Sequence, residues 1–401
     1  MACPKRIEWL RNRTYIEFED YHRPFLFPLE FISLAFVLVL AVFFNFATII
    51  TILRVQSLRQ KLGNMLIINL CVMDLITSLG SMLFSLIDIF YEGYFLCMEV
   101  FCRIHGGLAV IGCFGNFAAI ILIAVHRFIG VVAADKITLT AKHIVLMITG
   151  CWVFTLTIVI PPVTGIATSV YTHDTHHCSP TWVRSCPYYI TCISVIYGIT
   201  LPSMIICYSA IYWKVKSSRK RLVVHKRRGK RDDGPSLSKE QSTTSILKKH
   251  GTNTTDPANV YDPSKDSSHL DSGVSLTVVK YSSASKASEE LGIDEMSGPC
   301  HSGASKTMPG YSAKKKLNRT QEVDIRIALA GGLLVVTTAV CWTPFFVVNS
   351  CYRSREEVSH ALSVFAMWVA YTNSALDPII YSVLNKKLRN SILSQVRLLW
   401  R

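Results

Sequence analysis

Charged residues are scarce in this chain. Lys, Arg, Asp and Glu make up 17% of its 401 residues, whereas a soluble domain carries about a quarter. Hydrophobic residues make up 50%, and they gather in long blocks instead of being scattered. The composition therefore predicts a membrane protein.

Several other features are missing, and each absence narrows the function. No small-residue cleavage site follows the first apolar block, so we expect no signal peptide and interpret that block as a membrane span. There is no internal repeat or pair of broken spans, which disfavours a transporter or channel. No nucleophile–base pair or metal-ligand spacing is found in a cleft-forming region, so we expect no enzyme.

The positive charge is concentrated in one segment. Residues 214–321 contain 21 Lys/Arg and 11 Asp/Glu and supply +10 of the net charge of +15. The basic runs adjoin apolar blocks, which suits anionic lipid headgroups better than nucleic acid. Because the segment is rich in Ser, Thr and Gly and poor in aliphatic residues, we predict a disordered cytoplasmic loop with phosphorylation sites.

Seven apolar blocks are long enough to cross a bilayer as helices. The fold class is therefore an all-α, seven-helix membrane bundle. The predicted spans are 31–53, 64–90, 101–132, 142–164, 188–213, 323–350 and 359–384. The excess of Lys and Arg in alternate connections places the N-terminus outside and the C-terminus inside.

This topology divides the chain into five parts. They are an extracellular tail (1–28), spans one to five (29–213), the cytoplasmic loop (214–321), spans six and seven (322–384) and a juxtamembrane amphipathic helix (385–401). The last part alternates basic and apolar residues at helical spacing, as an interfacial helix does. Asn12 begins a glycosylation sequon on the outer side.

The third span organises the others. From Cys102 to Arg127 a helix covers about 37 Å, which places Cys102 at one membrane face and Arg127 at the other. Asn116 then lies near mid-depth. Polar residues inside spans are functional candidates, because burying them in lipid is costly. Here they include Asp74, Asn116, Asn373, Ser374 and Asp377.

This polar cluster allows two chemical interpretations. The carboxylates Asp74 and Asp377 lie at matching depth, where they could surround a hydrated cation or share a proton. Carboxylate, amide and hydroxyl oxygens are the ligands of a hard monovalent ion. We therefore expect a possible sodium site and no other cofactor.

Prolines and cysteines mark further positions. Pro202, Pro344 and Pro378 fall inside spans and should kink them, with Trp342 just before the second kink. Cys102 and Cys178 both face the oxidising compartment and can pair. The outer residues Cys97, Cys186 and Cys351 allow a second bridge whose connectivity the sequence does not fix.

Together these motifs resemble the rhodopsin-like G-protein-coupled receptors. The matching positions, in order along the chain, are Asn45, Asn69, Asp74, Cys102, Arg127, Trp152, Cys178, Pro202, the C-W-T-P run at 341–344 and the D-P-I-I-Y run at 377–381. Within the family, residues 178–189 are loosely similar to a medium-chain fatty-acid receptor, and the third span is loosely similar to the melatonin receptors.

The resemblance implies a mechanism and partners. An extracellular ligand binds among spans three, five, six and seven, Trp342 and the Pro344 kink repack, and span six swings out at its inner end. Arg127 and Tyr381 then line a cavity for a heterotrimeric G protein. The resemblance also implies receptor kinases and arrestin acting on the 214–321 loop, and location in the plasma membrane.

The resemblance also limits the ligand. Ala109 stands where amine receptors have an aspartate, and Tyr371 stands where opsins have their Schiff-base lysine, so we expect neither a biogenic amine nor retinal. Pocket candidates are Ala109, Arg184, Phe345, Phe346, Asn349 and Tyr371. Arg184 could pair with a ligand carboxylate, or it could be a solvated loop residue. An apolar ligand with one polar head fits this lining, and a peptide stays open.

The inner end of the third span departs from the family. His126 replaces the acidic residue before Arg127, and Phe128 replaces the following tyrosine. The alternative to a ligand-controlled receptor is therefore a constitutively active or G-protein-independent one. Asp324 stands where the family has the acid that holds this arginine from span six.

We predict that Asp324 is the main restraint on Arg127 in the inactive state. The change Asp324→Asn should raise basal G-protein signalling, because it removes the charge that pairs with the guanidinium. Basal nucleotide exchange in membranes without ligand measures this. Unchanged basal exchange would refute the proposed lock.

Overall fold

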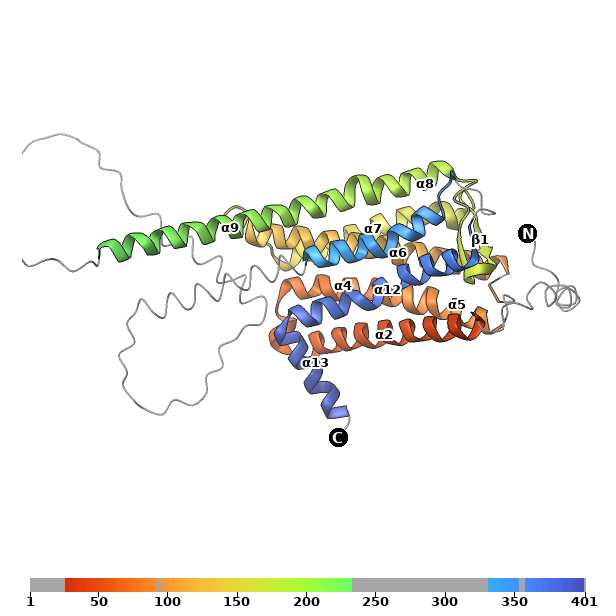
Figure 1. Cartoon of the computed structure of the whole chain (residues 1–401), viewed down its shortest axis with the longest axis horizontal. Coiled ribbons are helices and arrows are strands. Elements are labelled where there is room, and N and C mark those ends of the chain that lie inside the picture. The colour runs from red at the N-terminus through yellow and green to blue at the C-terminus, as the bar shows by residue number, and fades with distance from the viewer. Residues whose placement is uncertain (1–25, 92–94, 97, 233–330, 353–357, 400–401) are drawn as a thin grey trace, which may run out of the picture.

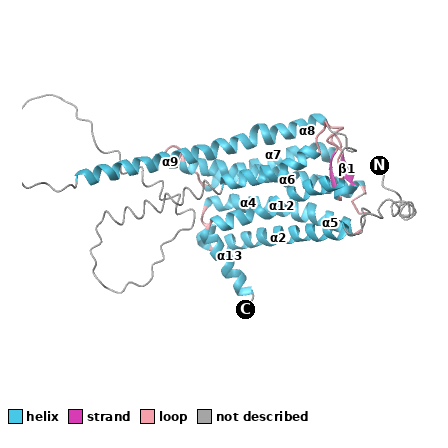
Figure 2. Ribbon diagram, viewed as in Figure 1, coloured by secondary structure: helices cyan, strands magenta, loops and turns pink. Residues whose placement is uncertain are grey.

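The computed structural model describes residues 26–91, 95–96, 98–232, 331–352 and 358–399. Side chains of 26–27, 219–232 and 398–399 are left undescribed. Asn12, Cys97 and Asp324 lie outside the described residues, so the glycosylation site and the Arg127 lock stay predictions. Within these ranges, long helices lie side by side, and a short hairpin of strands covers one end (Figures 1 and 2).

Most of the bundle comes from the first two-thirds of the chain. Helix α2 (Leu26–Arg54) is followed by the short α3 (Gln56–Arg59). The second span is α4 (Leu62–Thr77), the π-helical segment η2 (Ser78–Met82) and α5 (Leu83–Phe90). The third and fourth spans are α6 (Glu99–Val131) and α7 (Ala141–Thr164). The fifth is α8 (Cys186–Ile193), the π-helical η4 (Ser194–Thr200) and α9 (Leu201–Asp232).

Two further helices and an interfacial helix complete the bundle. The sixth span is the helical segment Gly331–Val348, and the seventh is α12 (His360–Leu384). Six described helices are long and apolar enough to cross a membrane. Helix α12 is less apolar because it carries polar residues such as Asn373 and Asp377, yet it packs against α2 and α4 within the bundle. The seven-helix prediction is confirmed.

Helix α13 (Lys386–Leu399) turns away from the bundle axis (Figure 1). Asn385 separates it from α12, and its side-chain oxygen accepts a hydrogen bond from the Leu388 N–H at 3.2 Å. This is the N-cap arrangement that lets a new helix start in a new direction. The predicted short C-terminal amphipathic helix is therefore present.

Two helix boundaries differ from the sequence prediction. Among the described residues, helix α2 already includes Leu26, inside the predicted tail, and Pro28 is tolerated near a helix start, where its missing N–H is not needed. Helix α9 continues past residue 213 to Asp232, inside the predicted loop. Its Lys, Arg and Val residues permit helix propagation once the buried part has nucleated it.

The outer hairpin consists of β1 (Ser169–Thr172), the 3-10 turn η3 (His173–Thr175) and β2 (His177–Pro180). The strands pair antiparallel, with Tyr171 opposite Cys178. Gly106 of α6 permits their close approach, because a Cβ there would lie 2.5 Å from the Ser169 hydroxyl oxygen. The hairpin therefore lies directly on the outer end of α6.

The predicted Cys102–Cys178 disulfide fixes this contact between α6 and β2. A second disulfide joins Cys186, at the start of α8, to Cys351, just after the sixth span. The sequence left that pairing open. It ties the outer ends of spans five and six together.

Helices α4 and α6 approach closely through glycines. A Cβ on Gly112 would lie 2.1 Å from the Thr77 hydroxyl and 3.2 Å from its Cα, and one on Gly115 would lie 2.4 Å from the Met73 sulfur. Because the Thr77 backbone cannot yield as a flexible side chain would, only glycine fits at 112.

We expect Gly112→Ala to lower the free energy of unfolding by about 1–3 kcal/mol through overpacking. Gly150→Ala on α7 is the matched control, because a Cβ there meets nothing within 4 Å. The control should leave stability unchanged or raise it by about 0.5–1 kcal/mol. Thermal unfolding of both purified variants compares them, and equal Tm values would contradict the packing argument.

Candidate functional site

The polar residues predicted at mid-depth form one connected cluster. The Asn116 amide of α6 donates to Asp74 Oδ1 of α4 and to Asp377 Oδ2 of α12, both at 2.8 Å. Asn373 donates to Asn116 Oδ1 at 3.1 Å and to Asp377 Oδ2 at 3.2 Å. Asp74 and Asp377 are fully buried. The cluster therefore joins three helices through charged or ionisable groups.

Several acceptor oxygens of this cluster are unsatisfied. Asp74 Oδ2, Asp377 Oδ1 and Asn373 Oδ1 are buried and have no hydrogen-bond partner among the described residues. Such groups are costly unless something else binds them. Two carboxylates and an amide oxygen are the donor set of a hard cation, so the residues fit the expected sodium ion.

The neighbouring buried asparagines have interhelical roles. Asn45 donates to the carbonyls of Ala41 and Ser374, each at 2.8 Å. Asn69 accepts from the Trp152 indole N–H at 3.0 Å. Asn45 thus links α2 to α12, and Asn69 links α4 to α7.

A cavity lies nearer the outer end, between α4, α6, the sixth span, α12 and β2. Its volume is about 30 Å³, room for a few water molecules. Its lining residues are Thr77, Ser81, Ala109, Val110, Cys113, Phe114, His177, Ser179, Pro180, Trp182, Trp342, Phe345, Phe346, Met367 and Tyr371. Apart from His177, no described lining residue has a side chain that is charged at neutral pH.

The aromatic part of this lining is one packed cluster. Trp342 has its ring centroid 6.0 Å from that of Phe345 and 6.2 Å from that of Phe346. Trp182, from the segment after β2, contacts Phe346 at 6.4 Å. The indole N–H groups of Trp182 and Trp342 are buried without a partner among the described residues.

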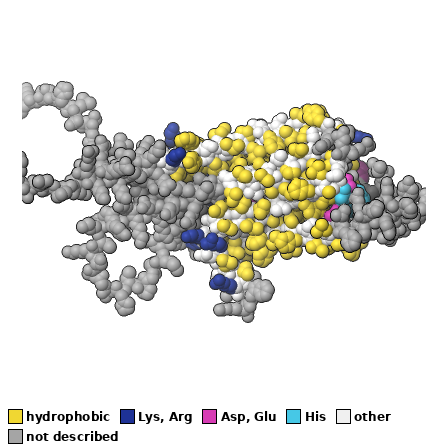
Figure 3. All heavy atoms as spheres, in the orientation of Figure 1, with side chains coloured by type: hydrophobic (Ala, Val, Ile, Leu, Met, Phe, Trp, Pro, Cys, Tyr) yellow, Lys and Arg dark blue, Asp and Glu magenta, His cyan; other side chains and the backbone are white. Residues whose placement is uncertain are grey.

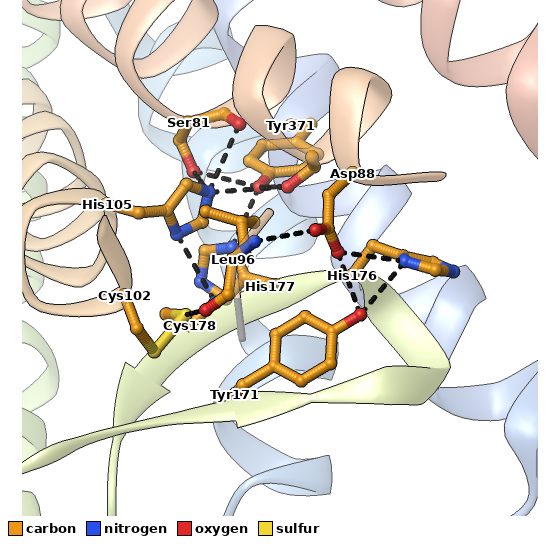
Figure 4. Close-up of a disulfide and its surroundings, with 11 residues drawn as sticks. Ser81, Asp88, Leu96, Cys102, His105, Tyr171, His176, His177, Cys178 and Tyr371 are labelled. Atoms are coloured by element: carbon orange, nitrogen blue, oxygen red, sulfur yellow. Dashed lines mark hydrogen bonds and ion pairs between the residues drawn. A yellow bond between two sulfur atoms is a disulfide. The ribbon is translucent and has the colours of Figure 1, made fainter. Parts of the chain in front are cut away.

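Figure 4 shows the polar corner of the cavity. The Tyr371 hydroxyl lies 2.9 Å from Ser81 Oγ and 2.9 Å from His177 Nδ1. His105 accepts from the Cys178 N–H through Nδ1 at 3.2 Å, so its Nε2 carries the proton and donates to the Ser81 carbonyl at 3.2 Å. His105 is therefore a neutral link between α6, η2 and β2.

His177 is also neutral. Burial and the neighbouring His105 hold the pKa of His177 well below its ordinary value. The corner therefore presents hydrogen-bonding groups without charge.

The predicted pocket residues divide into two sets. Ala109, Phe345, Phe346 and Tyr371 line the cavity, as does Trp342. Arg184 and Asn349 do not. Arg184 is exposed on the segment after β2, and Asn349 donates to the Phe345 carbonyl of its own helix at 2.9 Å. Their role at a ligand pocket stays a prediction, since loop path and helix rotation decide which way such residues face.

Sequence reasoning missed several lining residues, including His177, Ser179 and Trp182. One signal was present. His177 and Ser179 flank Cys178, and a bridge from Cys178 to the third span necessarily brings its neighbours over the bundle. The depth to which the hairpin reaches was not readable from sequence.

The predicted helix-distorting prolines all lie within helices. Pro202 is the second residue of α9, just after the π-helical η4, and Pro378 lies inside α12. Pro344 lies in the sixth span, between Trp342 and Phe345. The π-helical segment is a local irregularity of a kind frequently found at functional sites. The switching role of these prolines and of Trp342 stays a prediction.

At the inner end, His126 and Arg127 are buried against α4. A Cβ on Gly63 would lie 2.9 Å from the His126 ring and 3.5 Å from Arg127 Nη2. Gly331 of the sixth span packs so closely on the Tyr208 ring of α9 that no Cβ would fit. The inner ends of spans five and six are therefore in contact. Tyr381 is buried in α12.

Comparison with known proteins now gives the family. The model of the 7 transmembrane receptor (rhodopsin family) matches residues 44–381. The chain belongs to the rhodopsin family of seven-transmembrane receptors. Family members are signalling receptors, and membership implies coupling to heterotrimeric G proteins.

This rhodopsin-family chain is also similar to several named receptors. It is 25% identical over 345 residues to human "5-hydroxytryptamine receptor 1F", with 84% of each chain covered. It is 25% identical over 377 residues to the zebrafish (Danio rerio) "Alpha-2Da adrenergic receptor", with 88% of each covered. Squid rhodopsin shares the fold, with a TM-score of 0.65 at 15% identity, covering 93% of this chain and 86% of that one.

The Asn116 bridge should be important for the stability of this receptor. We expect Asn116→Ala to cost about 2–4 kcal/mol, because it leaves two buried carboxylates without their shared donor. Thr155→Ala is a buried control whose hydroxyl donates only to the Cys151 carbonyl of its own helix, and it should cost about 1 kcal/mol. Tm measurements on both variants decide, and equal losses would show that the bridge adds nothing.

Proposed function

We propose that this chain is a plasma-membrane receptor for an apolar, uncharged ligand that carries hydrogen-bond acceptors. The ligand binds in the outer cavity, and activation moves the inner end of span six away from span five to admit a G protein. The observation that supports this most strongly is the lining, which is aromatic and aliphatic with one neutral polar corner. Trp182 and Trp342 offer two indole donors without partners among the described residues.

The small volume of the cavity supports the proposal that this is the resting form. Ligand pockets usually have volumes of about 300–1,000 Å³, well above the space present here. Ligand entry must therefore displace the aromatic cluster around Trp342. Because that residue lies two positions before Pro344, such a displacement would act directly on the helix kink.

A biogenic amine is the second candidate, since the relatives are named as 5-hydroxytryptamine and adrenergic receptors. The cavity disfavours it. Ala109 lines the cavity where an aspartate would be needed, and no described lining residue is a carboxylate. A buried ammonium without a counter-ion costs several kcal/mol, of which an aromatic face restores about 2.

The surface supports the proposed orientation. In Figure 3, hydrophobic side chains cover the middle of the bundle. Most of the visible Lys and Arg lie toward the end near α13, whereas the visible acidic and histidine side chains lie at the end near β1, together with a smaller basic group. Both disulfides lie at the β1 end, as an oxidising outer compartment requires. The positive-inside tendency then supports a cytosolic α13 end.

We also propose that sodium binds beside Asp74 and Asp377. The unpartnered oxygens of these two residues and of Asn373 support it. A cation there would offset the repulsion between two buried carboxylates and so favour the packed arrangement of α4, α6 and α12. Arrestin and receptor kinases acting on the 214–321 loop stay proposals without structural support, because most of that loop lies outside the described residues.

A ligand screen with G-protein sensors tests the proposed ligand class. We expect agonists among neutral apolar compounds with carbonyl or ether oxygens, and no response to 5-hydroxytryptamine or noradrenaline. Phe345→Ala should lower agonist potency about 10–100-fold, because it removes an aromatic wall of the cavity. Basal signalling measured in the same cells separates a silent receptor from a constitutively active one.

Val347→Ala is the matched control, because Val347 lies on the same helix, is 55% exposed and does not line the cavity. It should leave potency unchanged. A wild-type response to an amine, or equal effects of the two variants, would overturn the proposed ligand class.

A further inference from the structure

A histidine at the outer face lies between two carboxylates. His360, the first residue of α12, places Nε2 2.7 Å from Glu30 Oε1 and Nδ1 3.0 Å from Asp174 Oδ1. A neutral imidazole donates from one nitrogen only, and a carboxylate oxygen at neutral pH only accepts. Both contacts together therefore require the doubly protonated ring. The geometry therefore suits the imidazolium.

The protonated ring joins three segments that are distant in sequence. Glu30 belongs to α2, Asp174 to η3 and His360 to α12. Their side chains are 14%, 44% and 17% exposed, so water and protons reach them. His105 and His177, by contrast, are buried. Loss of the proton would force the ring to give up one carboxylate.

A second histidine anchors the same turn from its other side. His176 Nδ1 lies 3.1 Å from Asp88 Oδ2 of α5, and the Tyr171 hydroxyl donates to that oxygen at 2.8 Å. The His176 backbone has φ of 45° and ψ of 46°, the left-handed region that non-glycine residues seldom adopt. The turn thus holds an uncommon conformation that directs the His176 ring toward Asp88.

The turn continues directly into the cavity wall. His177 is the next residue, and its ring contacts Tyr371 of α12 (Figure 4). We call the hairpin from Ser169 to Pro180 the outer lid. Because η3 and β2 are contiguous, release of η3 from α12 would loosen the position of His177 as well.

We propose that the extracellular proton is a second ligand of this protein, which binds at His360 between Glu30 and Asp174 and holds the outer lid closed over the cavity. The described titratable groups facing His360 are Glu30 from α2 and Asp174 from η3. Those facing His176 are Asp88 from α5, Tyr171 from β1 and His173 from η3, whose ring centroid lies 5.3 Å away.

The sign of the effect follows from the two carboxylates. They stabilise the imidazolium, so the closing contribution is complete at low pH and is lost as pH rises through the titration of His360. Tyr171 does not compete. Burial and the charge of Asp88 raise its pKa, and the phenol stays a donor throughout this range.

Cys113 provides a direct readout, because it is a buried free thiol that lines the cavity. The rate at which a small methanethiosulfonate reagent labels it can be followed by mass spectrometry of the purified full-length protein. Dividing the rate for His360→Ala by the wild-type rate at each pH cancels the thiol's own ionisation. We expect a ratio of about five or more near pH 6 that falls toward one near pH 8.

Four further variants make the test decisive. The residue that replaces histidine in His360→Gln cannot titrate, and the double change Glu30→Gln with Asp174→Asn removes both carboxylates. In both variants the labelling of Cys113 should depend on pH as it does in His360→Ala. His143→Ala, at the exposed start of α7, should label like wild type at every pH. Cys113→Ser gives the background from other thiols.

A ratio that stays constant with pH, or a carboxylate double variant that behaves like wild type, would overturn the proton site. The measurement uses neither ligand nor G protein. Its failure would therefore leave the proposed receptor function standing, and failure of the ligand screen would leave the proton site standing.

Discussion

Two buried carboxylates at the centre of a membrane bundle are the constraint on which the rest of the structure depends. Asp74 and Asp377 come from different helices, and the amide of Asn116 donates to both. Without a shared donor, each carboxylate would carry an uncompensated desolvation cost of several kcal/mol. The bridge therefore sets the relative depth of α4, α6 and α12, and the close approach at Gly112 and Gly115 brings the first two near enough to form it.

Helix α6 carries this constraint to the outer face. Its first turns hold Cys102, whose disulfide fixes β2 across the bundle, and His105, whose neutral ring accepts the Cys178 N–H. The outer lid is thus attached by a covalent bond and a hydrogen bond at nearly the same point. The η3 turn, by contrast, is held to α12 and α5 by the side-chain pairs Asp174–His360 and His176–Asp88, which makes it the part whose position solution conditions can change.

The outer half of the molecule separates neutral from charged chemistry. Around the cavity, His177 and Tyr371 are buried, and burial keeps His177 uncharged. At the rim, His360 lies partly in water between two carboxylates, where the charged ring is favoured. The same residue type therefore has opposite roles a short distance apart, because solvation and neighbouring charge decide which protonation state is stable.

The seven spans, the disulfide from the third span and the identity of the mid-depth polar cluster were determined by the sequence alone. In lipid, the backbone of a long apolar run must form a helix to satisfy its hydrogen bonds. Polar side chains within such a run, such as those of Asp74 and Asp377, then face the bundle interior, because exposing them to lipid is costly.

Only the tertiary structure decided which side chains meet. It paired Cys186 with Cys351, excluded Arg184 and Asn349 from the cavity and brought His360 between Glu30 and Asp174. Hydropathy fixes how deep a residue lies, but helix rotation and loop path fix which way it faces, and these depend on packing between segments hundreds of residues apart in sequence.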